Sequence, residues 1–579
     1  MKTKPLIPWH EKALALVGAL TLAFTAWGFG GVIDWSLHIM LAGGLLTFAL
    51  AIFPNVRGQR PEGRGQRTEL GEQKAGSMAQ GVTAKRSVDI PVHHHSVAAR
   101  TTEVSHRVKS SASPAFIPKQ PGNASPPTTH LSRRLVRANQ REAPINEKPE
   151  RLNFTPAHWL SLLFAAAFLA YLAISAFNPA WRIASDERGW WLESVVPPLA
   201  AWLPTSVEAR YEPMNVWRIF NMHLAAFSLA LGLYFGLSSR RAVLFVFWFF
   251  LVNVALMAVV AIVQKYTSAG AVLWMLPSQN RNFWGSFFYR NQGAAFLNWG
   301  IVVAAVLYFY HSGKARLLMR SGGPHFLAFC LIGLIALSVT FALSRGGILF
   351  ASLLVLVFVI LAIAHYFYGA ATQLNRHTLI LTGALTFILT FLLSAGLYQL
   401  NRNIDWQAIE KRFGDIEATI DNADRDARML STKATWVMAQ DQLWAGWGAG
   451  SFRYAFPMYQ QDVPELFYSR NHRKRGWEGR KFYRYAHNDI VQFLAEYGIV
   501  GCSLLGLTLL SLLAPALRYA GQAPLSTLFL LLGIAAALAH AFIEFIFHSP
   551  AYWVSFITMI ALTSRLLQLT AYRRRKSET

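Results

Sequence analysis

Twelve long apolar runs require this chain of 579 residues to cross a lipid bilayer many times. A bilayer core of about 30 Å needs roughly 20 predominantly apolar residues to cross it as a helix. The runs cover residues 13–30, 35–54, 157–178, 216–236, 241–263, 292–310, 325–343, 347–368, 378–398, 489–514, 524–547 and 551–570. We therefore predict an all-α polytopic membrane protein with about 12 transmembrane helices.

The composition agrees with this class and raises one question. Hydrophobic residues make up 54% of the chain and charged residues only 15%, whereas soluble proteins usually carry about 25% charged residues. The formal net charge is nevertheless +24, which in a soluble protein would suggest binding to nucleic acid. The position of the charge along the chain decides between these two explanations.

Lys and Arg accumulate in cytoplasmic loops of membrane proteins, and this bias sets the orientation. With the N-terminus in the cytoplasm, twelve spans return the C-terminus there, and the short cytoplasmic segments hold fourteen Lys and Arg against Glu11 and Glu578. Residues 55–153 add 17 Lys and Arg against 8 acids on the same side. The charge thus reflects topology, and no nucleic-acid partner is predicted.

The segments between the apolar runs define the domain organisation. Two N-terminal helices within 1–54 precede a basic linker, 55–153, whose composition is typical of disorder. A solvated tether and electrostatic contact with the anionic leaflet are both open for this linker. The remaining divisions are 154–398 with helices three to nine and an outer segment at 179–215, a large and partly helical outer loop at 399–488, and 489–579 with three helices and a basic tail.

Polar residues at the outer ends of the predicted spans carry the chemistry. Arg290, Arg345, His487, Glu544 and His548 come from distant parts of the sequence but meet the same membrane surface. The planar arginine side chain makes paired hydrogen bonds to phosphate oxygens. Histidine can take a proton from a hydroxyl near neutral pH. This combination suits displacement of a lipid-linked diphosphate by a sugar hydroxyl.

Each of these residues also has a purely structural interpretation. Arg345 could belong to a tight turn, Arg290 could anchor its span at the headgroups, and His487 could simply precede a helix. Glu544 could hydrogen-bond to a neighbouring helix as readily as it could serve function. His540, Glu544 and His548 are spaced by four residues, so a continuous helix would place all three on one face.

The start of the tenth predicted span contains three further polar residues. Asp489 and Gln492 resemble a helix N-cap and its N3 partner, which predicts a structural role for both. Glu496 lies nine residues beyond His487, about 900° along a helix, and therefore on the opposite face. We expect Glu496 to be a packing or span-pairing carboxylate rather than the residue that orients His487.

Several short motifs lie along the second half of the chain. The first is His487-Asn488-Asp489 with Gln492, Leu494, Glu496, Gly498 and Gly501. The others are the run Gly446-Trp447-Gly448-Ala449-Gly450-Ser451-Phe452, Arg428 and Trp436 before it, Ser344-Arg345-Gly346, and Tyr289-Arg290-Asn291-Gln292. Together these motifs resemble the O-antigen ligase and polymerase superfamily, and the resemblance covers about residues 216–570. Asn291-Gln292 departs from the pattern, in which an Asn-His pair is common.

This resemblance implies a bacterial inner-membrane glycosyltransferase that acts on undecaprenyl-diphosphate-linked glycan at the periplasmic face. It implies His487 as the catalytic base and Arg345 as a catalytic residue, with Arg290, Arg428 and Asn291 at the diphosphate. Glu544, His548 and Asn488 are possible supporting residues. No metal and no cofactor are implied, and the expected partners are the lipid-linked donor, a lipid or glycan acceptor, and membrane lipids.

Three activities share these motifs, namely ligation of glycan to the lipid A core in lipopolysaccharide biosynthesis, polymerisation of O-antigen or exopolysaccharide repeat units, and transfer to protein. The motifs describe the donor half of the reaction, so the acceptor stays open. A polysaccharide transporter is the main alternative outside this class. Transporters place charged residues near the bilayer midplane, whereas the candidate charges here gather at one outer surface.

Overall fold

The computed structural model describes residues 8–57, 156–187, 189–212, 214–268, 270–317, 323–370, 427–471, 476–480 and 482–578. The longer helices are α1 (Trp9–Trp27), α2 (Asp34–Arg57), α5 (Pro156–Phe177), α6 (Val216–Gly236), α7 (Arg240–Thr267), α8 (Arg290–Leu317), α9 (Pro324–Phe341), α10 (Arg345–Ala370), α16 (Asp489–Arg518), α17 (Pro524–Ala541) and α18 (Pro550–Glu578). Shorter helices are α13 (Ala427–Asp441), α14 (Phe452–Gln460) and α15 (Pro464–Phe467).

Seven short strands accompany the helices, so the described chain is mostly rather than entirely helical. The strands are β1 (Pro179–Asp186), β2 (Gly189–Ser194), β3 (Ser206–Glu208), β4 (Ala271–Val272), β5 (Leu276–Pro277), β6 (Tyr468–Asn471) and β7 (Gly476–Arg480). They form one three-stranded sheet in the order β2-β1-β3 and two separate hairpins, β4-β5 and β6-β7.

Ten helices in the described ranges are long and apolar enough to cross a membrane, and they coincide with ten of the twelve predicted runs. The run at 13–30 corresponds to α1, whose first turn contains Glu11 and Lys12 and which is not among the ten. The run at 378–398 lies outside the described residues, as does the linker from residue 58 onward. The spans are therefore confirmed as a multi-pass helical architecture.

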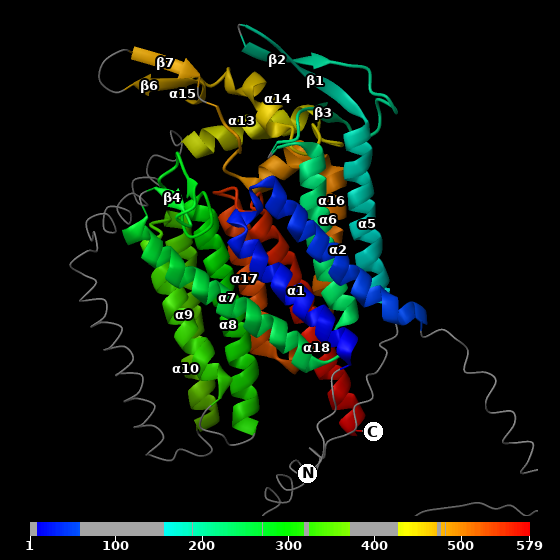
Figure 1. Cartoon of the computed structure of the whole chain (residues 1–579), viewed down its shortest axis with the longest axis vertical. Coiled ribbons are helices and arrows are strands. Elements are labelled where there is room, and N and C mark those ends of the chain that lie inside the picture. The colour runs from blue at the N-terminus through cyan, green and yellow to red at the C-terminus, as the bar shows by residue number, and fades with distance from the viewer. Residues whose placement is uncertain are drawn as a thin grey trace, which may run out of the picture. The chain divides into compact units, whose positions relative to one another are not determined.

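Helices α8 and α18 are the most buried spans and form the centre of the bundle. α18 packs against α6, α7 and α16, while α8 packs against α7, α9, α10 and α17. Figure 1 shows α1 crossing the bundle obliquely beside α7 and α18. Helices α8 and α18 bury large side chains, including Trp299 and Trp553.

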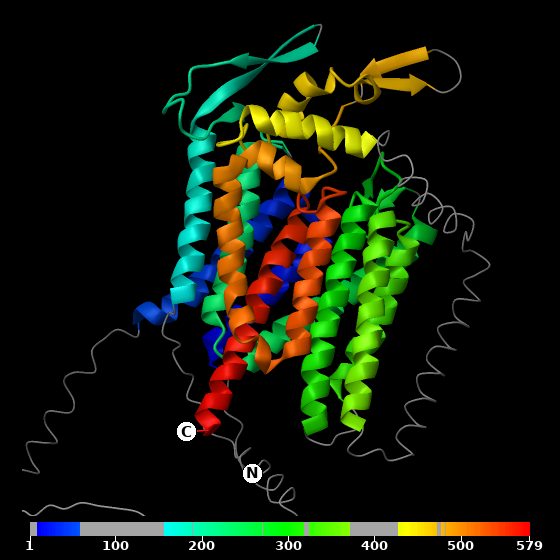
Figure 2. The same cartoon turned by 180° about the vertical axis from the view of Figure 1, so that it is seen from behind.

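The strands β1–β3 and helices α13–α15 lie together at one end of the bundle (Figures 1 and 2). We call this assembly the cap. It has a hydrophobic core of its own, with Met438, Trp447, Phe452 and Phe456 at its centre and Trp181 of β1 packed against them. The cap therefore folds from two segments that the sequence separates by more than 200 residues.

Candidate functional site

The segment between α17 and α18, residues 542–549, carries a buried carboxylate that contacts residues of three other motifs. The Arg428 guanidinium lies 2.7 Å from Glu544 Oε1, and the His487 Nδ1 lies 3.4 Å from Oε2. The Asn291 amide donates to Oε1, and the Tyr289 hydroxyl donates to Oε2 at 3.4 Å. We call these five residues the Glu544 cluster.

The backbone at His487 adopts a conformation that few residues other than glycine tolerate. Its φ is +59°, in the left-handed region, and such strain persists only where surrounding contacts enforce it. Ala486 before it donates its N–H to the Gln492 side chain at 2.9 Å. Asn488 after it caps α16 by accepting from the Val491 N–H at 3.1 Å. The histidine is thus held in place by both chain neighbours.

An aromatic stack fixes the other side of this histidine. Phe545 lies between the rings of Tyr289 and Tyr485, with centroid distances of 4.8 and 4.4 Å. The His487 ring meets Phe545 edge to face at 4.9 Å and keeps 24% of its side chain exposed. The imidazole therefore has one nitrogen directed at Glu544 and enough exposed surface to reach a ligand.

The surroundings of Glu544 favour its ionised form. Burial alone would raise the pKa of this carboxyl, but the hydrogen bond with His487 and the charge of Arg428 together hold its pKa below the ordinary value. Burial raises the pKa of the Tyr289 hydroxyl, and the negative charge of Glu544 raises it further. The carboxylate can thus stabilise a positive charge on His487.

The structure corrects the prediction that His540, Glu544 and His548 share one helical face. α17 ends at Ala541, before both Glu544 and His548. The Phe547 N–H donates to the Asp489 carboxylate at 2.7 Å, and the Phe545 carbonyl accepts from the Gln292 amide at 3.1 Å. Contacts with other segments satisfy these backbone groups, so the chain has no need to continue as a helix.

Asp489 also corrects a prediction, because Asn488 and not Asp489 is the N-cap of α16. The Asp489 carboxylate instead lies 2.5 Å from the His548 Nδ1. The Gln492 amide lies 3.0 Å from the other nitrogen of His548 and donates to Glu496 at 3.1 Å. His548 therefore belongs to a buried network beside the Glu544 cluster, and it holds segment 542–549 against α16.

Glu496 ends this network at the glycine-rich run of the cap. Its carboxylate accepts the N–H groups of Gly450 at 3.0 Å and Phe452 at 3.3 Å. Gly450 has a φ of +74°, and a Cβ there would lie 2.1 Å from the Met214 carbonyl oxygen. The glycines of this run permit close backbone packing, and Glu496 has the structural role that the sequence predicted.

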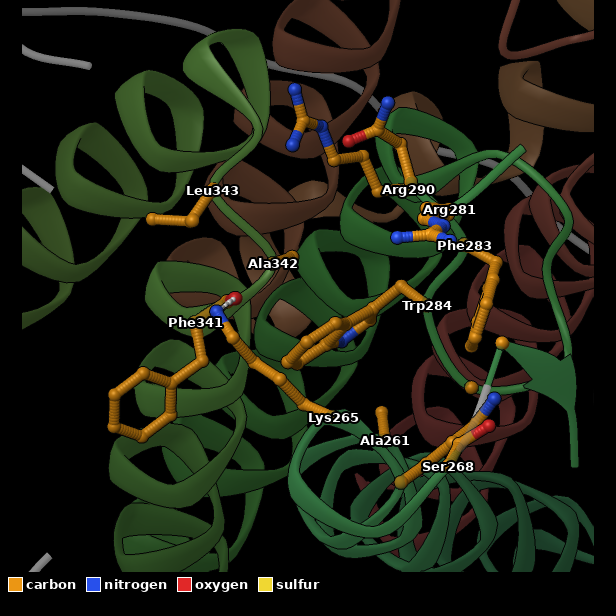
Figure 3. A pocket seen from close by; sticks show the side chains of 14 residues that line it. Ala261, Lys265, Ser268, Arg281, Phe283, Trp284, Arg290, Phe341, Ala342 and Leu343 are labelled. Carbon is orange, nitrogen blue, oxygen red and sulfur yellow. Dashed lines mark hydrogen bonds between the residues drawn. The ribbon is translucent and has the colours of Figure 1, made fainter. Parts of the chain in front are cut away.

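A cavity of about 510 Å³ lies next to the Glu544 cluster and contains one of the predicted arginines (Figure 3). Arg290 lines it together with Lys265 and Arg281. We call it the basic cavity. Arg290 is the first residue of α8, between Tyr289 and Asn291, whose side chains turn to Glu544 instead. The segment 289–291 therefore joins the two sites.

Arg345 begins α10, next to the turn that forms another wall of this cavity. Ala342 and Leu343 line the cavity, and Gly346 packs so closely on α17 that a Cβ would lie 2.7 Å from the His540 ring. The structure thus brings His487, Arg428, Asn291 and Glu544 into direct contact and sets Arg290 beside them. Asn488 caps α16, His548 contacts Asp489, and Arg345 precedes Gly346, which packs against His540 and Ile543.

Sequence reasoning missed Tyr289 as a partner of Glu544, and it missed Lys265 and Arg281. For Lys265, the available signal was its position as a charged residue near the end of an apolar run. In the described ranges, no group of three or more His, Cys, Asp or Glu side chains is arranged to hold a metal ion.

Comparison with protein families supports the resemblance drawn from the motifs. Residues 326–506 match the family described as O-antigen ligase. The match includes Arg345, Arg428 and His487 but ends before Glu544 and begins after Arg290. No curated protein matches the chain.

Proposed function

We propose that this O-antigen-ligase-like chain transfers a glycan from an undecaprenyl-diphosphate-linked donor to an acceptor hydroxyl at the periplasmic face of the inner membrane. The observation that carries the proposal is the pairing of His487 with the ionised Glu544, within a cluster that also holds Arg428 and lies beside Arg290. Such a site combines a base with cations for a departing diphosphate.

His487 is the base in this proposal. An imidazole that donates from Nδ1 to Glu544 keeps the lone pair on Nε2, which can accept the proton of the acceptor hydroxyl. The hydroxyl oxygen then bonds to the anomeric carbon as the bond from that carbon to the phosphate oxygen breaks. Glu544 stabilises the imidazolium that forms, as a carboxylate does in other base–orienter pairs.

The arginines receive the charge that develops on the leaving diphosphate. Arg290 lines the basic cavity, and Arg345 begins α10 two residues after Leu343, which also lines it. The Arg428 side chain is 43% exposed although it pairs with Glu544, so a ligand can reach its guanidinium. Cations fixed near a developing negative charge lower the barrier without any proton transfer of their own.

The test is deletion of the gene followed by analysis of the cell's glycans, with complementation by wild type, His487→Ala or Arg345→Ala. Loss of long-chain polymer indicates a repeat-unit polymerase, whereas accumulated lipid-linked chains with an uncapped acceptor indicate a ligase. Glycan that appears on protein indicates transfer to protein. Glycan that is attached to no acceptor indicates a polysaccharide transporter. The proposal fails if both variants insert at wild-type levels and restore normal glycan.

A further inference from the structure

The basic cavity collects three cations from three segments of the chain. Lys265 comes from the last turn of α7, Arg281 from the loop after β5, and Arg290 from the start of α8. None of the fourteen described lining residues is acidic. A cavity with three positive side chains and no matching carboxylate in its wall is complementary to a polyanion.

Lys265 is held toward the cavity rather than left to follow the membrane surface. Its ammonium donates to the carbonyl of Phe341, the last residue of α9, at 2.7 Å. It also lies 5.8 Å from the centre of the Trp284 ring, which forms the middle of the cavity wall in Figure 3. The carbonyl and the ring thus hold the ammonium at the cavity wall.

The polypeptide connects this cavity to the proposed reaction centre over a very short distance. Arg290 lines the cavity, and its neighbours Tyr289 and Asn291 contact Glu544. The Arg290 N–H also donates to the Asn282 carbonyl at 2.7 Å, which ties the Arg281 loop to the start of α8. Within residues 289–291, the middle side chain therefore lines the cavity, and the side chains before and after it contact Glu544.

We infer that Lys265 and Arg281 complete, with Arg290, a binding site for a lipid-borne diphosphate. The inference rests on the proposed function and adds two residues to the binding of the donor. A donor with a sugar on one end and a lipid on the other carries two negative charges on its diphosphate. Release of the sugar adds a third, so three cations also suit the leaving group as its charge develops.

Phosphate chemistry at a membrane surface has a second source, the headgroups of ordinary anionic phospholipids. The binding experiment separates the two. Purified full-length protein in detergent is titrated with geranylgeranyl diphosphate, then with geranylgeranyl monophosphate, and finally in the presence of excess phosphatidylglycerol. We expect the diphosphate to bind more tightly than the monophosphate, and phosphatidylglycerol not to displace it. Equal displacement by phosphatidylglycerol would assign the cavity to membrane lipid and overturn the inference.

The variants are Lys265→Gln and Arg281→Gln, with Arg241→Gln as the matched control at the opposite, exposed end of α7. Each cavity variant should weaken diphosphate binding by about tenfold, the size expected when one charge-assisted hydrogen bond is lost. Lys265→Arg should retain most of the binding. Wild-type affinity in both Gln variants, at unchanged thermal stability, would show that Arg290 acts without them.

Failure of this inference is distinguishable from failure of the proposed function. The binding titration contains no acceptor and no glycan, so it does not depend on turnover. Glycan transfer by wild type together with unaltered binding in the Gln variants removes only the roles of Lys265 and Arg281. Diphosphate binding that follows the predicted pattern, without any glycan product, removes the transferase proposal and keeps the cavity as a diphosphate site.

Discussion

A buried carboxylate costs stability unless cations and hydrogen-bond donors surround it, and Glu544 has both. Its oxygens contact the side chains of Arg428, His487, Asn291 and Tyr289. Asn291 and Tyr289 flank Arg290 in the sequence, and the other two residues come from separate segments. A histidine bound in this way has a fixed orientation and a fixed tautomer. Glu544 is therefore a positioning residue, since it acts through His487 rather than on the substrate.

Replacing Glu544 with Gln should lower kcat by roughly tenfold or more, because a hydrogen bond to a charged group contributes about 1.5–3 kcal/mol. Steady-state kinetics of glycan transfer measures this loss. Glu193→Gln, in an exposed ion pair with Arg182 on the cap, is the control and should behave as wild type. A Glu544→Gln enzyme with wild-type kcat would contradict this role.

At the scale of elements, segment 542–549 determines the site, and hydropathy could not reveal it. The residues Phe542, Ile543, Phe545 and Phe547 continue the apolar run, so the sequence predicted a helix to residue 547. The chain leaves the helix because Asp489, 58 residues earlier, accepts the Phe547 N–H. A pairing over that distance has no local signal. The outer convergence of His487 and Glu544, in contrast, was predicted from span ends alone, whereas Arg428 was found only through a motif.

His548 gives the anchoring of this segment a pH dependence. Burial lowers the pKa of His548, but the adjacent Asp489 carboxylate outweighs it and raises the pKa above the ordinary 6.5. A group whose pKa rises on folding stabilises the fold fully below its unfolded pKa, and this contribution is lost as the pH rises through the folded value. Thermal unfolding of wild type should therefore shift to lower temperature above that pH. The shift should be absent in His548→Gln, and an equal shift in both proteins would refute the assignment.

The glycine-rich run offers a second test at this scale. Gly450→Ala should destabilise the cap, because the new Cβ would lie 2.1 Å from the Met214 carbonyl oxygen at a φ of +74°. The change also disturbs the N–H that Glu496 accepts. Gly506→Ala in α16 is the control, since nothing lies within 4 Å of its Cβ and Ala favours a helix by about 1 kcal/mol. Thermal unfolding in detergent should separate the two, and equal stability would contradict the packing described.

For the whole molecule, the two ends of the bundle are chemically different. Glu11 of α1 accepts the N–H groups of Ser238 and Ser239 at 2.9 and 2.6 Å, and Arg565 of α18 donates to the Leu237 carbonyl at 2.6 Å. These contacts lie at the end of α6 remote from the cap (Figure 1). The charge pattern of the sequence predicts that this end faces the cytoplasm and the cap faces outward.

Cysteine labelling tests that orientation. In a background without Cys330 and Cys502, a cysteine at Val196, which is 90% exposed beside the cap, should react with an impermeant maleimide in intact spheroplasts. A cysteine at Arg241, in the first turn of α7 and predicted to face the cytoplasm, should react only after lysis. The reverse pattern would place the cap and the Glu544 cluster on the cytoplasmic side.

The sequence could predict the spans, because apolar length depends on the bilayer alone. It could not predict the basic cavity, because Lys265, Arg281 and Arg290 become neighbours only when the ends of α7, α8 and α9 pack together. Arg290 was found through a motif, whereas Lys265 looked like an ordinary interfacial cation. The sequence can thus indicate single residues of a site between helices, but it cannot show which residues packing brings together.

The most direct test of the account is glycan transfer by purified protein in detergent, supplied with a lipid-diphosphate-linked glycan and a hydroxyl acceptor. Wild type should release lipid diphosphate in step with glycosylated acceptor, and His487→Ala, folded to the same thermal stability, should be slower by about 10²- to 10⁴-fold, the range for loss of a general base. Product formation by His487→Ala at the wild-type rate, or no product from wild type with any of the three acceptor classes, would contradict it.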